Sequence, residues 1–248
     1  MGRNGNREAG LPDSHLNIDE VIFTSYCFGE QYTGQQVRLA KSILKIYPKA
    51  NLHFINESEE IGKPKFQKSL YGFKVQMIFD CLKKGFKKIV YFDTAICLER
   101  EIDEWFNLTY LYGFLALRDK SLLATVISNN CLNAMGVDRE ALGNTELLGG
   151  SVYVIDFNTV RGQHIFAEWS AMERMGLFGT QDDLSHDRLQ SHRMDEACLA
   201  LVFHLNGMEP FAHNLMHYAY EHPETKELHH EYPAGEEVNP IVIKRHFK

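Results

Sequence analysis

The feature that most constrains the fold is an alternation of strand and helix patterns over roughly the first hundred residues. Strand-like apolar runs occur in "EVIFTSYCF", "NLHFIN" and "KKIVYF", and between them lie two stretches whose apolar residues repeat about every 3.6 positions. A helical crossover between two strands makes those strands parallel. The sequence therefore predicts an α/β fold, in which a parallel sheet is covered by helices on both faces.

The two crossover helices have recognisable ends. The first runs through "TGQQVRLAKSILKIYPKA", in which Pro48 closes the apolar pattern, and the second runs through "YGFKVQMIFDCLKKG", in which Gly85 is the stop signal. The third strand follows directly after this glycine. We expect it to be an interior strand, because β-branched and aromatic residues occupy it almost without interruption.

The second half of the chain continues the mixture of strands and helices. Strand patterns lie in "GFLALR", in residues 152–157 and in the C-terminal "PIVIKRHFK". Helix patterns lie around Trp169, ending near Gly176, and through "MDEACLALVFHLNG". No linker or repeat divides the chain. We therefore expect a single domain over residues 19–248, preceded by a polar, disordered arm over residues 1–18.

Composition excludes several classes of protein. The 248 residues are 44% hydrophobic and 24% charged, which is ordinary for a globular chain, and the net charge of -7 argues against a nucleic-acid partner. Five cysteines without a CxxC pair favour reduced thiols in a cytosol-like compartment. No apolar run approaches the roughly 20 residues of a membrane span, and the amino terminus lacks a signal-peptide core. A cytoplasmic location is expected.

One acidic residue interrupts the interior strand pattern. Asp93 follows the apolar run 89–92 and is therefore expected at the carboxyl end of the third strand. In open α/β sheets ligands bind outside the carboxyl ends of the strands, so this position favours contact with a ligand. The alternative interpretation is that Asp93 is a turn residue or the cap of a short helix.

The common glycine-rich phosphate motifs are absent. After the first strand the sequence reads "TSYCFGEQYTG", which matches neither GxGxxG nor GxxxxGK[ST]. The glycine-rich loop with Arg and Lys that a sugar nucleotidyltransferase carries at this point is also missing. A nucleotide would therefore be held without a glycine cradle. One way is through a divalent metal ion with carboxylate ligands.

Four segments together resemble the GT-A glycosyltransferases. They are "YGFKVQMI", the strand ending "YFDTAI", "GGSVYVIDF" and "MDEACLALVFHLNG", and the resemblance covers about residues 20–206. The retaining families are most similar, namely the glycogenin-like enzymes and the histo-blood-group type. The resemblance implies a mixed, mostly parallel sheet and a hexosyltransferase-type activity that retains the anomeric configuration. It further implies a nucleotide-sugar donor, with a UDP-sugar favoured, and a glycan or protein acceptor.

The resemblance also implies metal ligands. In those families an Asp-x-Asp motif chelates a manganese ion, and Asp93 matches its first Asp, whereas Thr94 and Ala95 occupy the next two positions. Half of the expected side-chain ligation is thus missing. A C-terminal histidine is a ligand in the glycogenin-like enzymes, and His246 lies in a comparable place. Mn²⁺ or Mg²⁺ is the implied cofactor. The alternative is neutralisation of the diphosphate by basic side chains, for which the candidates are Lys74, Arg118, Lys244 and Arg245.

The implied catalytic residues lie in the last helix pattern. Glu196 in "MDEACLA" matches the glutamate that faces the anomeric carbon in the histo-blood-group type, and Asp195 precedes it. Either carboxylate could stabilise positive charge at the anomeric carbon, or act as nucleophile or base. Their alternative role is to favour the amino terminus of a helix, where acidic residues interact well with the helix dipole.

The remaining candidates concern donor binding. Three residues at the end of the first strand would contact the nucleoside, with Tyr26 stacking on a base, and three more would bring backbone close to the sugar. Lys74 could reach a phosphate, or extend its charged end to water. Ordinary strand ends and turns are the alternative roles of the other positions. The donor-binding candidates are Thr24, Ser25, Tyr26, Lys74, Asp93, Thr94 and Ala95, and the sugar-binding candidates are Gly149, Gly150 and Ser151.

Two other functions stay open from the sequence. Ala95, at the position of an expected metal ligand, would fit a catalytically degenerate GT-A-like module that binds a glycan or a protein. A sugar nucleotidyltransferase is the second alternative, against which the missing glycine-rich loop argues.

Overall fold

A computed structural model of the chain describes residues 16–57, 71–179 and 194–211, and the backbone of residues 216–221, 228–231 and 242–247. The first described residue is already anchored, because the Leu16 N–H donates to Asp103 Oδ1 over 2.9 Å. The arm expected over residues 1–18 is therefore fixed at its last residues. Its remainder, residues 1–15, lies outside the described residues.

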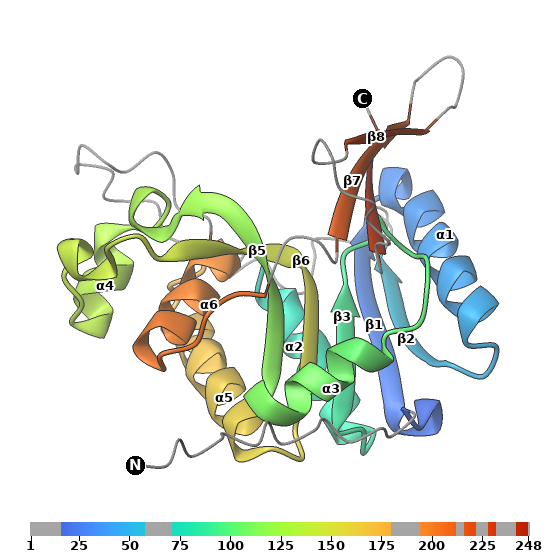
Figure 1. Ribbon diagram of the computed structural model, residues 1–248, viewed down its shortest axis with the longest axis horizontal. Helices are drawn as coiled ribbons and strands as arrows, with labels where there is room; N and C mark the ends of the chain where they lie inside the picture. Colours follow the sequence, from blue (N-terminus) through green and yellow to red (C-terminus); the bar gives the residue numbers. More distant parts are fainter. Residues whose placement is uncertain are drawn as a thin grey trace, which may run out of the picture.

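The molecule contains two sheets (Figure 1). The strands of the larger sheet are β1 (Val21–Phe28), β2 (Asn51–Glu57), β3 (Lys88–Phe92), β5 (Phe114–Leu122) and β6 (Glu146–Asp156), in the order β2-β1-β3-β6-β5. Strands β2, β1 and β3 are parallel, and β6 is antiparallel to both β3 and β5. The expected mixed, mostly parallel sheet is confirmed.

The helices cover both faces of this sheet (Figure 1). They are α1 (Glu30–Ile46), α2 (Gly72–Lys83), α3 (Asp103–Tyr112), α4 (Asn129–Met135), α5 (Val160–Arg174) and α6 (Met194–Leu205), with 3-10 helices η1 (Ile18–Glu20), η3 (Leu123–Thr125) and η4 (Arg139–Leu142). Side chains alternate along β3, so Ile89 and Tyr91 pack in the core under α2, α5 and α6. Val90 and Phe92 pack in the opposite core, under α1 and α3.

The smaller sheet has the order β4-β9-β7-β8 and consists of β4 (Ile96–Leu98), β7 (Met216–Glu221), β8 (Leu228–Glu231) and β9 (Val242–Phe247). It begins directly after the central strand of the larger sheet, because only three residues separate β3 from β4. Strand β9 confirms the strand pattern at the carboxyl terminus. Strands β4 and β8 were not predicted, because three or four residues are too few to show an alternation, and the six-residue β7 was also missed.

Strand β6 differs from its predicted limits. It begins at Glu146 instead of residue 152, so Gly149 and Gly150 lie inside the strand and not in a turn before it. Strand β5 explains this, since it pairs across the first glycine, with Leu117 opposite Gly149. The cross-strand partner overrides the local preference of glycine for turns. The turn interpretation of the two glycines is therefore wrong.

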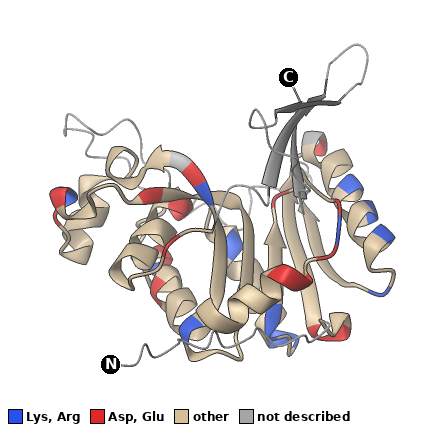
Figure 2. Ribbon diagram, viewed as in Figure 1, with Lys and Arg blue, Asp and Glu red and all other residues tan. Residues whose placement is uncertain are grey.

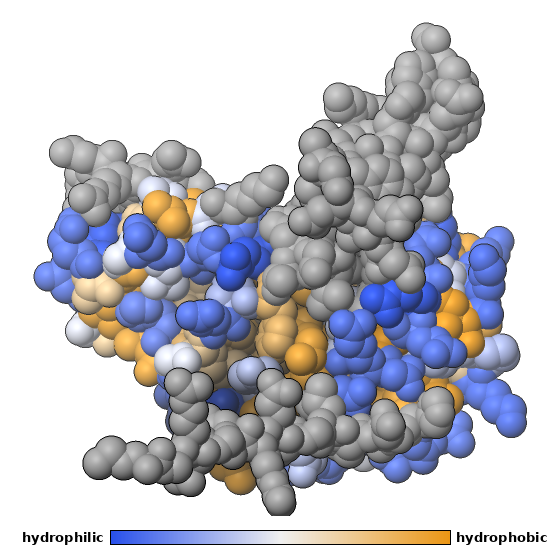
Figure 3. Space-filling view, viewed as in Figure 1, coloured by the Kyte–Doolittle hydropathy of each residue, from blue (hydrophilic) through white to orange (hydrophobic). Residues whose placement is uncertain are grey.

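The face drawn in Figure 3 is largely hydrophilic, with an apolar patch near its centre. Charged residues lie mainly in the helices, in the loops and near the ends of the strands (Figure 2). All five cysteines are buried free thiols. Within the described residues, no helix combines the length and the hydropathy that a membrane span requires.

Candidate functional site

Asp93 lies immediately after β3, in the middle of the larger sheet. Its N–H donates to Ser151 O over 2.9 Å, and its Oδ1 accepts a hydrogen bond from the Tyr91 hydroxyl at 2.7 Å. In the sheet, β2 lies on one side of β1 and β3 lies on its other side. The strand order therefore reverses between β1 and β3. Ligands bind at such a reversal in open α/β sheets. Asp93 is therefore placed where a ligand is expected.

A buried ion pair lies beside Asp93. The Lys74 Nζ of α2 donates to Asp195 Oδ2 and to Gly150 O, both over 2.8 Å, and Lys74 and Asp195 are each only 2% exposed. The Tyr153 hydroxyl donates to the same carboxylate oxygen over 2.9 Å. This arrangement joins α2, β6 and the start of α6. Lys74 therefore points inward to a carboxylate and not outward to water.

The surroundings of Lys74 stabilise its positive charge. Burial lowers the pKa of Lys74, but Asp195, Asp93 and Glu196 outweigh burial and raise that pKa above its ordinary value. The ammonium also lies 5.2 to 5.6 Å from the ring centres of Tyr71, Tyr91 and Tyr153, within cation–π range. Burial raises the pKa of Asp195, an effect opposed by Lys74 and Tyr153. We conclude that the lysine is charged at neutral pH.

Glu196 is positioned by a glycine. Its Oε1 accepts a hydrogen bond from the Gly150 N–H at 3.1 Å, and a Cβ atom on Gly150 would lie 2.6 Å from Glu196 Cγ. A side chain at position 150 would therefore displace the glutamate. Glu196 is half-buried, so its carboxylate is held in place while remaining accessible. Gly150 thus binds Glu196 through its N–H and Lys74 through its carbonyl group.

The start of α6 has an unusual backbone. Met194, its first residue, has a φ of 43°, a value that residues other than glycine rarely adopt. Asp195 and Glu196 follow it directly, and the Asp195 carbonyl accepts a hydrogen bond from Trp169 Nε1 at 3.0 Å. Backbone strain of this kind is concentrated at functional sites in proteins generally. Here it lies beside both acidic candidates.

The positions after Asp93 differ in their contacts. The Thr94 hydroxyl donates to Gln35 Oε1 over 3.3 Å, so it is directed toward α1, and Ala95 has no ligand atom in its side chain. Strand β9 pairs antiparallel with β4, with Ile96 opposite Lys244. This pairing ends at Ile96, three residues after Asp93, so it brings the backbone of β9 near the candidate site without pairing His246 with any residue of it. The His246 side chain lies outside the described part of the chain.

Strand β1 lies on the other side of the strand reversal and runs to Phe28, so Thr24, Ser25 and Tyr26 lie inside it and not at its end, where they were expected. The Thr24 hydroxyl donates to His53 O over 3.0 Å and is thus used inside the sheet. Tyr26 is 7% exposed and stacks on Phe73 with ring centres 4.7 Å apart, so its ring is largely covered by α2. The Ser25 Oγ is fully buried without a hydrogen-bond partner within the described residues. An unsatisfied buried hydroxyl is costly, and a ligand could satisfy it.

The structure thus brings most of the candidates together. Asp93, Lys74, Asp195, Glu196 and the 149–151 segment form one cluster at the ends of β3 and β6. Sequence reasoning missed the hydroxyl groups of Tyr91 and Tyr153, each of which binds one of the acidic candidates. A signal existed in the sequence, since a tyrosine in a buried strand needs a partner for its hydroxyl group.

The fold is that of an α/β protein, with an acidic cluster at the strand reversal, where ligands bind in open α/β sheets generally. No protein-family model matches the chain, and no curated protein matches its sequence. The apo structure of the WbbM bifunctional glycosyltransferase matches with a TM-score of 0.54 and 9% identity, covering 93% of this chain and 46% of that chain. This chain therefore spans about half the length of that protein.

A second solved structure is that of the galactosyltransferase LgtC in complex with donor and acceptor sugar analogues. It covers 90% of this chain and 86% of its own chain, with 14% identity and a TM-score of 0.41. The first likeness shows the fold. The chain has the GT-A fold, as the resemblance in its sequence predicted.

Proposed function

We propose that the chain is a glycosyltransferase that transfers a sugar from a nucleotide-diphosphate sugar, preferably a UDP-sugar, to a hydroxyl group of a glycan or protein acceptor. Retention of the anomeric configuration and a cytoplasmic location belong to the same proposal. The observation that carries it is the cluster of Asp93, Asp195 and Glu196 around the buried Lys74 at the reversal of the strand order. The GT-A fold supports it.

The two carboxylates at the start of α6 suit different roles. Cleavage of the bond to the diphosphate develops positive charge at the anomeric carbon, and a fixed carboxylate stabilises that charge. Glu196 is suited to this role because the Gly150 amide orients it while it stays half-exposed. Asp195 is buried and bound by two donors, so it holds Lys74 and the start of α6 in place.

The charge of the cluster favours a cation. Three carboxylates face one ammonium group, and this excess of negative charge would repel a diphosphate unless positive charge lay between them. Within the described residues no three His, Cys, Asp or Glu side chains form a metal site of their own. We propose that Asp93, with His246, would hold Mn²⁺ or Mg²⁺, hard cations that prefer carboxylate oxygens. The ion would neutralise the leaving diphosphate.

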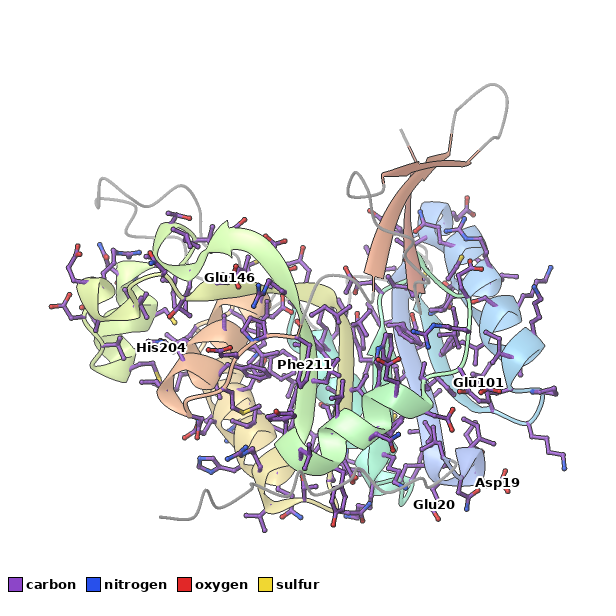
Figure 4. The ribbon with its side chains drawn as sticks, in the orientation of Figure 1. Asp19, Glu20, Glu101, Glu146, His204 and Phe211 are labelled. Carbon is purple, nitrogen blue, oxygen red and sulfur yellow. The ribbon has the colours of Figure 1, made fainter. Side chains whose placement is uncertain are left out.

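Calorimetry with UDP, GDP and CMP, each with and without Mn²⁺, tests the proposal. We expect heat with UDP that increases with Mn²⁺, and a loss of that increase in Asp93→Asn. A matched control is Asp19→Asn. Asp19 lies just before β1, at the end of the sheet opposite to the one that carries Asp93 (Figure 4). No heat with any of the three nucleotides would contradict the proposal.

A second candidate function is a module that binds a glycan or protein without catalysis. Ala95 favours it, because a side chain without ligand atoms stands where the related families have an aspartate. The two candidates differ in turnover. A catalyst hydrolyses UDP-galactose or UDP-glucose slowly in the absence of acceptor, and Glu196→Gln slows that hydrolysis. A binding module gives hydrolysis equal to buffer with both proteins.

A further inference from the structure

A polar pocket with a volume of about 420 Å³ lies away from the carboxylate cluster. It is lined by β5, by the start of β6 with the turn before it, and by the end of α6 with the segment that follows. We call it the β5–β6 pocket. The polar residues that line it are Arg118, Asn144, Thr145, Glu146, His204 and Glu209. Figure 4 labels Glu146 and His204 on its two sides.

The walls of the β5–β6 pocket are fixed by contacts between its own residues. Arg118 Nε lies 2.7 Å from Glu146 Oε2, and the Thr145 hydroxyl lies 2.8 Å from His204 Nδ1. The segment after α6 adds to the edge of β5, since the Phe211 N–H donates to Ala116 O and its carbonyl accepts from the Arg118 N–H. Polar groups held in this way are preorganised to bind a ligand.

The chemistry of the lining selects a class of ligand. One arginine is balanced by Glu146 and Glu209, so the pocket has no excess positive charge for a phosphate or a nucleotide. The lining is too polar for a lipid chain. Guanidinium, carboxylate, amide and imidazole groups together offer donors and acceptors to neighbouring hydroxyl groups. Met208 and Pro210 add apolar surface for the C–H face of a sugar ring.

The distance from the carboxylate cluster defines the role of this sugar. Along α6, His204 lies eight residues after Glu196, which corresponds to about 12 Å of helix. Along β6, Glu146 lies four residues before Gly150, which corresponds to about 13 Å of strand. A single sugar ring cannot contact both places. The occupant of the pocket is therefore not the sugar that reacts.

We propose that the β5–β6 pocket binds a non-reacting sugar unit of an oligosaccharide acceptor, whose reacting hydroxyl group lies beside Glu196. The proposal rests on the proposed glycosyltransferase function and adds to it the class of acceptor. It requires the acceptor to contain more than one sugar unit. A free monosaccharide occupies only one of the two places and binds weakly.

The test uses the full chain on a glycan array of mono- to tetrasaccharides, in the presence of UDP and Mn²⁺. Two variants alter the pocket: Glu146→Ala removes a polar wall, and Asn144→Trp fills the space from an exposed position. Glu104→Ala is the matched control, because it breaks an exposed Arg–Glu pair elsewhere, between Arg100 and Glu104. UDP binding and the thermal midpoint are measured for every protein.

We expect the wild type and Glu104→Ala to bind oligosaccharides and not monosaccharides. Both pocket variants should weaken that binding at least about tenfold, with UDP affinity unchanged. Equal oligosaccharide binding by the wild type and Asn144→Trp would contradict the proposal that the pocket binds a sugar unit. UDP binding without binding of any saccharide would contradict it as well. If UDP does not bind but oligosaccharide binding is lost in Asn144→Trp, the pocket is supported and the proposed function fails.

Discussion

At the scale of single residues, Gly150 links the two halves of the cluster, since its N–H binds Glu196 and its carbonyl group binds Lys74. We predict that Gly150→Ala lowers the turnover of a UDP-sugar about 100-fold or more, because the new methyl group displaces the Glu196 side chain. The stability should change little, since that side chain is half-exposed and flexible. Kinetics and urea unfolding measure the two effects.

Gly34→Ala is the control for this prediction. Gly34 is exposed in α1, and a Cβ atom on it would meet no atom within 4 Å, so the turnover of this variant should stay near that of the wild type. Normal activity of Gly150→Ala would show that the position of Glu196 does not matter for the reaction.

The ion pair between Lys74 and Asp195 belongs to the same scale. We predict that Lys74→Met lowers the free energy of unfolding by about 3–5 kcal/mol, because it leaves a buried carboxylate without its partner. Lys88→Met breaks the exposed pair with Glu20 and should cost about 1 kcal/mol or less. Urea unfolding followed by tryptophan fluorescence compares the variants. Equal urea midpoints for Lys74→Met and Lys88→Met would contradict the prediction.

The limits of sequence analysis are visible at this scale. Asp93 could be predicted as a site candidate from its place after a strand, and Glu196 only from the resemblance of its motif. The partner of Lys74 could not, since 121 residues separate it from Asp195 and no local pattern connects them. The sequence left open whether this lysine reaches a phosphate or water. The contact that the structure shows was not among those alternatives.

At the scale of elements, the position of α5 depends on two glycines. A Cβ atom on Gly162, in the first turn of α5, would contact the Asp156 carbonyl and lie 2.7 Å from Gly113 O, and both are backbone atoms that cannot rotate away. We predict that Gly162→Ala lowers the free energy of unfolding by about 1–3 kcal/mol, although alanine favours helices. Thermal and urea unfolding measure this loss.

The comparison variant is Gly136→Ala, at a left-handed position with open space around it. It should cost about 1 kcal/mol from backbone strain alone. If Gly162→Ala proved as stable as the wild type, α5 would have room to move away from the sheet.

Some helices and strands could be predicted from the sequence, and others could not. The first three strands carry long apolar runs separated by helices. The spacing of their apolar residues, and the Pro and Gly residues that end the helices between them, therefore define these strands. Strand β6 extends to Glu146 because β5 pairs with it, and α3, which contains the buried Trp105 and Phe106, is a helix that the sequence patterns above did not predict. Both depend on tertiary partners. Propensity within a window of sequence contains no information about them.

At the scale of the whole molecule, the two sheets meet at the candidate site. Strand β3 passes through Asp93 into β4, and β4 pairs with β9, the last strand of the chain. The register sets Lys244 opposite Ile96, three residues after Asp93. The backbone of the carboxyl-terminal strand therefore lies near Asp93, even though it is far from Asp93 in the sequence.

We predict that deletion of residues 242–248 abolishes the heat of UDP binding in the presence of Mn²⁺, because the proposed function assigns the metal ligand His246 to this segment, which also carries Lys244 and Arg245. The larger sheet should still fold. Trp105 and Trp169 are fully buried on opposite faces of this sheet, so their fluorescence and a cooperative urea transition check its folding directly.

Deletion of Lys248 alone is the length control. A combined Lys244→Ala, Arg245→Ala and His246→Ala variant separates the side chains from the strand, and loss of binding in it would assign the effect to charge and ligation. Full UDP binding by the 242–248 deletion would place the diphosphate elsewhere, because no cation from β9 would then be needed to offset the acidic cluster.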